Sequence, residues 1–306
     1  MKILVTGGAG FIGSHIVEHF SARSDVDTIV LDNLSTGNPD NLRGFNCELI
    51  EGSIEDDAVL AECCCGVDYI FHMAAMVSVV ESMDSPDKCV DTNVKGTLKV
   101  LKAAAQSGVK RIMFSSSCSV YGDPPVTPTS ESVPPDPLSP YALSKLDGEY
   151  YLKMFSDSWG IDYGIMRYFN VYGPRQNPAS QYAAAIPIFV SRALRGDDIL
   201  IYGDGSQSRD FVFVKDVVRA NLHMMEHGGG PFNVGTGRSV TIQKLAELIV
   251  SETDSSSRII NVDPRPGEVL HSCAVTEAIN AAGFVAETSL MDGLVQTIRY
   301  FAEKQS

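Results

Sequence analysis

The stretch of sequence that decides the fold lies at residues 2–13, Lys2-Ile3-Leu4-Val5-Thr6-Gly7-Gly8-Ala9-Gly10-Phe11-Ile12-Gly13. It reads as a short apolar strand, a glycine-rich turn and the first turn of a helix. Glycines at positions 7, 10 and 13 allow a tight turn and a close approach of the backbone to a bound group. A helix that starts there presents unpaired amide groups to negative charge. A glycine pattern alone is weak evidence, but this context predicts a turn that binds the pyrophosphate of a dinucleotide.

The end of the next predicted strand supports this interpretation. Thr28–Asp32 is an apolar run that closes on an acidic residue, Asp32. A carboxylate at this position accepts hydrogen bonds from both ribose hydroxyls of an adenosine and repels a 2′-phosphate. The sequence therefore predicts NAD, in preference to NADP, as the cofactor. The alternative, a glycine-rich turn without a ligand, does not account for the acidic residue.

Short apolar runs alternate with amphipathic stretches through the first half of the chain. The predicted strands are Lys2–Thr6, Thr28–Asp32, Cys47–Glu51, Tyr69–Met73, Arg111–Ser115 and Asp162–Arg167. The predicted helices are Ile12–Ser24, Asp57–Cys64, Pro86–Ser107 and Pro140–Trp159. This alternation predicts the α/β class, with a Rossmann-type doubly wound parallel sheet covered by helices on both faces.

The pattern becomes irregular in the second half, which predicts a smaller α/β domain for the substrate. We expect an NAD-binding domain over residues 1–170, joined by residues 210–236, and a substrate-binding domain over residues 171–306. Within the first domain, the proline-rich stretch Gly122–Pro140 is expected to be a loop. It follows a predicted strand, at the edge of the sheet where α/β folds place their active-site loops.

Composition excludes several other classes of function. The formal net charge of −14 argues against nucleic acid or an anionic membrane as the main partner. The 7 cysteines are odd in number and include three consecutive residues, Cys63–Cys65, so neither a disulfide framework nor a zinc site is predicted, and no metal is expected. No signal peptide or membrane-spanning run is evident. We therefore expect a cytoplasmic protein with free thiols.

A candidate catalytic pair stands at the start of the last predicted helix of the first half. Tyr141 and Lys145 are four residues apart and so share one helix face. The unperturbed pKa of a phenol is near 10, and an adjacent ammonium together with a positively charged nicotinamide ring would lower it toward the working pH. Such a pair is usually an ordinary solvated helix face. Here it follows a dinucleotide motif, an irregular loop and the serines Ser115–Ser117, which favours catalysis.

Together these motifs resemble the extended short-chain dehydrogenase/reductases, specifically the UDP-hexose and UDP-N-acetylhexosamine 4-epimerases. The resemblance covers nearly the whole chain. It is carried by Gly7–Gly13, Asp32-Asn33-Leu34, His72-Met73-Ala74-Ala75, Asn93, Ser115–Gly122, Tyr141–Lys145, Arg167–Gln176, Gly203–Val217 and Arg265–Ser272.

The resemblance implies a catalytic role for three residues. Tyr141 is the base that takes the proton of the sugar 4-hydroxyl, Lys145 binds the nicotinamide ribose and lowers the pKa of the tyrosine, and Ser117 hydrogen-bonds the reacting oxygen. Hydride passes from the sugar to NAD, and the resulting 4-keto sugar turns over and receives the hydride on its other face. NAD is regenerated and is expected to stay bound.

The resemblance also implies two sets of binding residues. Those expected at the cofactor are Gly7, Gly10, Phe11, Ile12, Gly13, Asp32, Asn33, Ser53, Ile54, Met73, Ala74, Ala75, Asn93, Ser115, Tyr141, Lys145 and Tyr168. Ser53 is a departure, since relatives usually carry an Asp there. Those expected at a UDP-sugar are Ser117, Tyr141, Asn170, Arg175, Arg209, Arg265 and Ser272. Forked guanidinium groups suit a diphosphate, and the small Ser272 predicts room for an N-acetyl group.

Related reactions remain as alternatives. The resemblance places an Asp-Glu pair in 4,6-dehydratases where this chain has Cys118 and Ser119, and decarboxylases usually have a Glu at the position of Ser119. Glucuronate 4-epimerases often have Thr at the position of Asn170. These differences favour a plain hexose epimerase over a dehydratase, decarboxylase, reductase or glucuronate 4-epimerase. A catalytically silent NAD(H)-binding regulator is disfavoured by the intact catalytic residues.

Relatives form homodimers by packing two helices of each subunit into a four-helix bundle. Pro86–Ser107 and Pro140–Trp159 would supply these helices. Apolar residues recur near helical spacing in the first of them, at Val90, Val94, Leu98 and Leu101. The same stripe could equally pack on the protein's own sheet, so the homodimer is an expectation from the resemblance alone.

Overall fold

The computed structural model describes residues 1–178, 184–264 and 269–305, and its contacts divide the chain into two compact units. Unit 1 comprises Met1–Gly122, Pro134–Tyr168 and Val218–Phe232. Unit 2 comprises Asp123–Val133, Phe169–Val217 and Asn233–Ser306. Unit 1 therefore includes a segment from the second half of the chain, Val218–Phe232, which lies within the residues 210–236 that we expect to join the NAD-binding domain. Part of the proline-rich loop belongs to unit 2.

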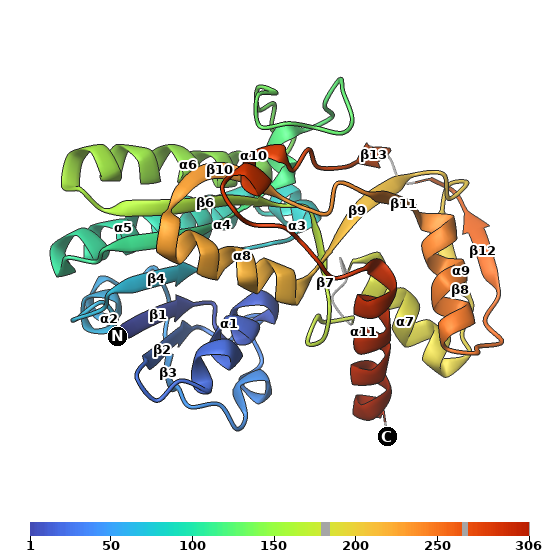
Figure 1. Ribbon diagram of the computed structural model, residues 1–306, viewed down its shortest axis with the longest axis horizontal. Coiled ribbons are helices and arrows are strands. Elements are labelled where there is room, and N and C mark those ends of the chain that lie inside the picture. The colour runs from blue at the N-terminus through green and yellow to red at the C-terminus, as the bar shows by residue number, and fades with distance from the viewer. Residues whose placement is uncertain (179–183, 265–268, 306) are drawn as a thin grey trace. The chain divides into compact units, whose positions relative to one another are not determined.

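A seven-stranded sheet forms the centre of unit 1 (Figure 1), in the order β10-β6-β5-β4-β1-β2-β3. The strands are β1 Lys2–Thr6, β2 Asp27–Asp32, β3 Glu48–Glu51, β4 Tyr69–His72, β5 Arg111–Ser117, β6 Asp162–Tyr168 and β10 Gly229–Val234. All five pairings from β3 to β6 are parallel. The predicted Rossmann-type parallel sheet is therefore confirmed, and the six predicted strands agree with the observed ones to within two residues at each end.

The strand order reverses direction beside β1. The chain runs outward through β1, β2 and β3 and then returns to place β4 on the other side of β1. The carboxyl ends of β1 and β4 therefore meet at the point where α/β sheets open a crevice for a ligand. The glycine-rich turn follows β1 directly, so the topology of unit 1 places it at this crevice.

Helices cover both faces of this sheet. They are α1 Phe11–Ser21, α2 Asp57–Cys63, α3 Val79–Asp84, α4 Pro86–Cys89, the π-helical η2 Val90–Lys95, α5 Gly96–Ser107 and α6 Pro140–Trp159. Consecutive side chains of β4 show the two faces. Ile70 is buried in the apolar cluster beneath α2, α5 and α6, whereas Phe71 packs against Phe20 of α1, with ring centroids 5.6 Å apart. Residues buried on both sides explain why the strands read as continuous apolar runs.

The prediction of one continuous helix over Pro86–Ser107 was wrong. The structure divides it into α4, a π-helical stretch and α5. The wider turn coincides with Asn93, whose buried amide group bonds the backbone of Met76 and the hydroxyl of Ser144. A tertiary role for one polar side chain is not visible in the spacing of apolar residues. π-Helical turns of this kind are frequent at functional sites.

Unit 2 is built around strand β9, Ser208–Phe213. Strands β7 (Asn170–Tyr172) and β13 (His271–Ser272) pair with it in parallel, and β11 (Ser239–Thr241) pairs in antiparallel. The remaining elements are a parallel pair, β8 Ile199–Tyr202 with β12 Ile259–Val262, and the helices α7 Ala185–Arg195, α9 Ile242–Glu252, α10 Glu277–Ala281 and α11 Leu290–Gln305. Helix α8, Val214–His227, carries the chain from unit 2 back into unit 1. Within the described residues, no helix is both long and apolar enough to cross a membrane.

The buried His72 at the end of β4 predicts a specific loss of stability in acid. Its ring bridges Thr6 Oγ1, 2.7 Å from Nδ1, and Thr97 Oγ1, 2.9 Å from Nε2. Burial, with a smaller contribution from the Lys145 ammonium, lowers its pKa to about 3. The folded protein therefore keeps this ring neutral while the unfolded chain takes up a proton near pH 6.5. The free energy of unfolding should fall as the pH drops from 6.5 toward 3, by about 2 kcal/mol at pH 5 from this group.

Urea unfolding at pH 7 and pH 5 checks this expectation. His72→Asn removes the titrating ring, so the difference in unfolding free energy between the two pH values should be smaller in the variant by about 2 kcal/mol. The same pH difference in both proteins would show that His72 does not cause the acid sensitivity.

Candidate active site

The glycine-rich turn of unit 1 has the shape that a pyrophosphate requires. Gly7 has a left-handed backbone with φ of 68°, and a Cβ there would lie 2.7 Å from the amide nitrogen of Ala74. A Cβ at Gly13 would lie 2.3 Å from the carbonyl oxygen of Gly7. Helix α1 begins at Phe11, directly after this turn, and its first amides have no carbonyl one turn earlier to bond. These residues therefore fit the phosphates of a dinucleotide.

Asp32 closes β2 beside this turn and is buried. Its Oδ2 accepts the amide of Ala9 at 2.9 Å, and its Oδ1 accepts the amide of Leu34 at 2.9 Å. A carboxylate has about four lone-pair sites, so each oxygen keeps the capacity to accept a further hydroxyl. The two backbone bonds hold the carboxylate in one orientation, as a ribose-binding group requires.

The loop after β4 lies against the glycine-rich turn. The amide of Met73 donates to the carbonyl of Thr6 at 3.0 Å, and the amide of Ala74 donates to Thr6 Oγ1 at 3.3 Å. Asn93 holds the far end of this loop, because its Oδ1 accepts the amide of Met76 at 2.7 Å and its Nδ2 donates to the carbonyl of the same residue at 3.0 Å. The predicted residues Met73–Ala75 thus lie at the crevice, and Asn93 acts by fixing their loop.

Three other residues predicted at the cofactor lie after β2 and β3. Asn33 is exposed, and its Oδ1 accepts both the amide and the hydroxyl of Ser35. Ser53 Oγ accepts the amide of Glu55 at 3.1 Å, and Ile54 is buried against the apolar cluster of unit 1. Each of these residues follows the carboxyl end of a sheet strand, which is the edge that the glycine-rich turn occupies.

Ser115 and Tyr168 lie on the neighbouring strands β5 and β6. The phenol of Tyr168 is buried, accepts the amide Nδ2 of Asn221 at 2.7 Å and lies close enough to Ser115 for that side chain to lower its pKa. Burial raises the pKa of Tyr168, so its hydroxyl stays protonated. Tyr168 is the last residue of its segment of unit 1 before the chain enters unit 2.

The three predicted catalytic residues come together in unit 1. Ser139 caps helix α6, accepting the amide of Ala142 at 3.1 Å, and the first two turns of the helix carry Tyr141 and Lys145. Ser117 ends β5, and its side chain lies close enough to the phenol of Tyr141 to lower the pKa of that phenol. The ammonium of Lys145 lies 5.8 Å from the centre of the Tyr141 ring. Helix α6 packs directly on β5, so the sheet fixes the distance between Ser117 and Tyr141.

The electrostatics of this pair differ from the sequence-based expectation. Burial raises the pKa of Tyr141 to about 12, against the opposing effect of the nearby Ser117 side chain. Burial also lowers the pKa of Lys145 to about 8. The lowering of the tyrosine pKa that we expect from the lysine ammonium together with the nicotinamide ring is therefore absent from the protein alone and stays a prediction for the cofactor-bound protein. Desolvation penalises both charged forms more than their proximity favours them.

A buried ion pair behind the catalytic residues was missed by the sequence analysis. Glu149 accepts Nε of Arg167 at 2.8 Å through Oε1 and Nη2 at 2.7 Å through Oε2. The hydroxyl of Ser116, adjacent to Ser117, donates to Glu149 Oε1 at 2.5 Å. The ion pair thus ties α6 to both β5 and β6. The available signal was spacing, because Glu149 lies one helical turn after Lys145 on the same face of α6.

Three of the residues predicted at the substrate come together in unit 2. Arg209 on β9 is the register partner of Ser272 on β13. Asn170 lies on β7, where it is the register partner of Phe211 on β9. It donates its amide Nδ2 to the carbonyl of Asp210 at 3.0 Å. The buried Asp210 carboxylate in turn accepts the amides of Thr236, Gly237 and Ala274. One strand therefore aligns Asn170, Arg209 and Ser272, and Asp210 fixes the loops around them.

The other two arginines predicted at the substrate are Arg175 and Arg265. Arg175 follows β7, has a left-handed backbone with φ of 67° and is an electrostatic neighbour of Tyr300 in unit 2. Arg265 lies outside the described residues.

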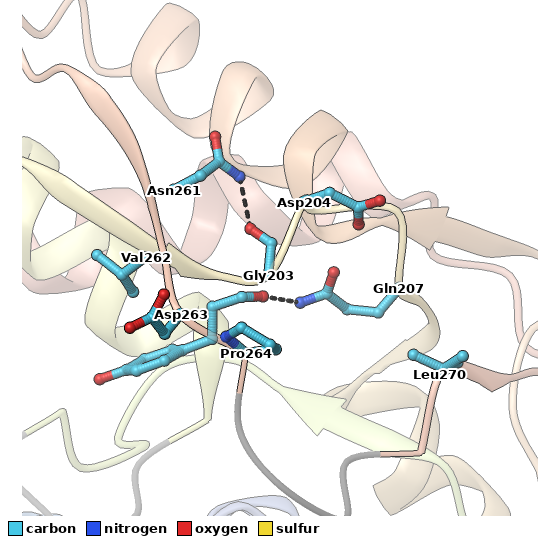
Figure 2. A pocket seen from close by; sticks show the side chains of 9 residues that line it. Gly203, Asp204, Gln207, Asn261, Val262, Asp263, Pro264 and Leu270 are labelled. Carbon is cyan, nitrogen blue, oxygen red and sulfur yellow. Dashed lines mark hydrogen bonds between the residues drawn. The ribbon is translucent and has the colours of Figure 1, made fainter.

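A pocket of about 630 Å³ lies in unit 2 (Figure 2). Its wall is made of residues at the ends of β8 and β12 and before β13, namely Tyr202, Gly203, Asp204, Gln207, Asn261, Val262, Asp263, Pro264 and Leu270. Two side-chain amides brace it, as Gln207 Nε2 donates to the carbonyl of Tyr202 at 2.7 Å and Asn261 Nδ2 donates to that of Gly203 at 2.8 Å. Arg209 reaches the rim, since its Nη1 donates to the carbonyl of Leu270 at 3.1 Å.

Breaking the buried ion pair should destabilise the protein strongly. In Glu149→Gln the guanidinium of Arg167 remains buried without a countercharge, which typically costs about 3–5 kcal/mol of unfolding free energy. The matched control is Glu247→Gln, because Glu247 pairs with Lys244 on the surface of α9, and exposed pairs contribute about 1 kcal/mol or less. Urea unfolding of the two variants measures both values, and equal losses would contradict the assigned role.

Comparison with known proteins agrees with this arrangement. Residues 3–235 match the model of the NAD-dependent epimerase/dehydratase family. The chain is 38% identical over 315 residues to the UDP-glucose 4-epimerase of Mycolicibacterium smegmatis, with 99% of each chain covered. Among solved structures it resembles UDP-glucose 4-epimerase with UDP-glucose from Thermotoga maritima, with a TM-score of 0.96, 40% identity and 100% of both chains covered. It also resembles the UDP-N-acetylglucosamine 4-epimerase from Methanobrevibacter ruminantium in complex with UDP-N-acetylmuramic acid, with a TM-score of 0.95, 40% identity, and 99% of this chain and 98% of that chain covered. The chain belongs to the NAD-dependent epimerase/dehydratase family.

Proposed function

We propose that this protein is an NAD-dependent 4-epimerase of UDP-sugars, acting through a transient 4-keto sugar. The observation that carries the proposal is the position of Ser117 and of the Lys145 ammonium beside the phenol of Tyr141, in the unit that also holds the glycine-rich turn. A phenol, a hydroxyl donor and an ammonium next to a dinucleotide site are the groups needed to oxidise and reduce a secondary alcohol.

The residues of this chain divide the work of the reaction. Bound NAD would supply the acceptor and donor of hydride for carbon 4 of the sugar and a positive charge that would favour the phenolate of Tyr141. Tyr141 accepts the proton of the 4-hydroxyl and gives it back after the sugar has turned its other face. Ser117 donates a hydrogen bond to the oxygen while it is a carbonyl. Lys145 is buried, so its ammonium is kept from water during these steps.

The substrate is bound through its diphosphate and its sugar. Support comes from Arg209, whose guanidinium lies at the rim of a pocket large enough for a nucleoside, with Asn170 and Ser272 on the neighbouring strands. Guanidinium groups bind diphosphates in bidentate fashion. Arg175 and Arg265 are proposed to add to this charge. The small Ser272 leaves room for an N-acetyl group, so UDP-GlcNAc and UDP-GalNAc are proposed substrates beside UDP-Glc and UDP-Gal.

Dehydration and decarboxylation are disfavoured by the residues that follow Ser117. Both reactions use a carboxylic acid there in the relatives that this chain resembles. Here Cys118 and Ser119 occupy the positions, and the Ser119 hydroxyl is directed at Ser117, 2.9 Å away. A hydroxyl group cannot serve as the carboxylic acid that these reactions require.

We further propose a cytoplasmic homodimer with a four-helix bundle between subunits. Support comes from large apolar side chains that are exposed on one side of α6: Leu143 is 48%, Tyr150 52% and Met154 56% exposed. Helix α3, which packs beside α6, exposes Val79, Val80 and Met83. Among the apolar residues that recur through Pro86–Ser107, Val90 is exposed, whereas Leu98 and Leu101 pack into the apolar cluster of unit 1. All seven cysteines are free thiols, as expected in a reducing compartment.

The first experiment incubates the purified protein separately with UDP-Gal, UDP-GalNAc and UDP-glucuronate, without added NAD, and follows the products by NMR. We expect the first two to be converted to their 4-epimers at unchanged mass. Tyr141→Phe removes the base and should lower kcat by a factor on the order of 10²–10⁴, while the protein retains its NAD.

Each other result has a distinct meaning. Conversion of UDP-Gal alone would keep the mechanism and overturn the argument from Ser272. Loss of mass would indicate a dehydratase or decarboxylase. No reaction, even with NAD supplied, would indicate a silent NAD-binding protein. A near-normal rate in Tyr141→Phe would exclude Tyr141 as the base.

The homodimer is tested by placing charge on the exposed face of α6. Leu143→Glu should convert the dimer to a monomer, because a buried, unpaired carboxylate at an interface costs several kcal/mol. Val285→Glu is the control, since Val285 is a similarly exposed apolar residue of unit 2. Analytical ultracentrifugation gives the mass of each species, and a wild-type protein that is monomeric would refute the proposal.

A further inference from the structure

The oxygen of Ser117 accepts two hydrogen bonds from a single neighbour. Ser119 donates its backbone amide to Ser117 Oγ at 3.2 Å and its own hydroxyl to the same oxygen at 2.9 Å. Both bonds arise because a short 3₁₀ helix, η3 (Cys118–Tyr121), begins immediately after Ser117 and is capped by it. The turn of η3 brings residue 119 back over the side chain that ends β5.

These two bonds fix the direction of the next one. A serine hydroxyl has one proton to donate and two lone pairs with which to accept. Ser119 occupies both lone pairs, so Ser117 can interact with the neighbouring phenol of Tyr141 only by donating its proton. A hydrogen bond donated to the phenol oxygen favours the phenolate, whereas one accepted from the phenol would favour the neutral form. The charged or titratable groups that face this phenol are Lys145 on α6, Cys118 on η3 and Cys89 on α4.

We propose that Ser119 is a positioning residue for the epimerisation: it saturates the lone pairs of Ser117, so that Ser117 acts only as a donor toward Tyr141 and the reacting oxygen. The inference rests on the proposed function for its catalytic meaning. Donation is the useful direction at each stage, because both the phenolate and the carbonyl oxygen of a 4-keto sugar accept hydrogen bonds and donate none.

The test compares Ser119→Ala with Ser119→Thr. The alanine variant keeps the backbone amide bond to Ser117 and loses the hydroxyl bond, so one lone pair is released. We expect kcat to fall about 5- to 10-fold, as for the loss of one hydrogen bond, with KM and the bound NAD unchanged. The acid limb of the pH profile of kcat should move to higher pH, because the phenolate of Tyr141 is less favoured. Ser119→Thr keeps the hydroxyl and should restore the wild-type rate and profile.

Ser132→Ala is the matched control. Ser130 and Ser132 form an exposed hydroxyl pair, 2.6 Å apart, in the proline-rich loop, so this variant also loses one serine-to-serine hydrogen bond. Its kcat and pH profile should be those of the wild type. A wild-type profile in Ser119→Ala, or an equal loss in Ser119→Ala and Ser119→Thr, would overturn the inference.

A second readout separates this inference from the proposed function. NMR of protein carrying carbon-labelled tyrosine, with Tyr141→Phe to assign the signal, follows ionisation of the Tyr141 phenol without turnover. Ionisation should require a higher pH in Ser119→Ala than in the wild type. If no UDP-sugar is converted but this shift is seen, the proposed function fails and the role of Ser119 stands. If turnover is seen but the shift is absent, the role of Ser119 is refuted.

Discussion

The parallel pairing of β1 with β4 is the constraint on which the site in unit 1 depends. It reverses the strand order, opens a crevice at the carboxyl edge of the sheet and brings the glycine-rich turn against the loop at residues 73–75. No side chain fits between Gly7 and Ala74, so the cofactor turn and the strand pairing require each other. The catalytic residues use the same edge, because Ser117 ends β5, the next strand along.

Burial positions the catalytic residues and also limits what they do alone. The packing of α6 on β5 that holds Tyr141 beside Ser117 buries Lys145 and partly buries Tyr141. It therefore raises the pKa of the phenol and lowers the pKa of the ammonium. The protein thus supplies geometry and hydrogen bonds, and the positive charge that makes the phenolate accessible has to arrive with the cofactor. This dependence suits an enzyme that keeps its cofactor bound through each turnover.

Local sequence was sufficient for the fold of unit 1, and it predicts the catalytic residues. Strands buried on both faces read as apolar runs, and the positions of Gly7, Tyr141 and Lys145 follow from motif and spacing. What the sequence could not give was long-range pairing between polar groups. The Glu149–Arg167 ion pair, the bonds of Asn93 that accompany a π-helical turn, and the dominance of burial over charge at Tyr141 all depend on which elements the fold brings together. Arg265, a substrate residue expected from its motif, lies outside the described residues.

Residue 119 links the choice of reaction to the alignment of the catalytic hydroxyl. Its side chain lies within hydrogen-bond distance of Ser117, so whatever stands there acts on the reacting oxygen or beside it. A carboxylic acid at this distance could exchange a proton with the 4-keto sugar and open a route to dehydration or decarboxylation. A serine hydroxyl is too weak an acid to release its proton at neutral pH. Here it instead orients Ser117 as a hydrogen-bond donor. The Ser119 hydroxyl thus replaces the carboxylic acid that the competing reactions need. Through Ser117 it also stabilises the oxygen on carbon 4 during 4-epimerisation.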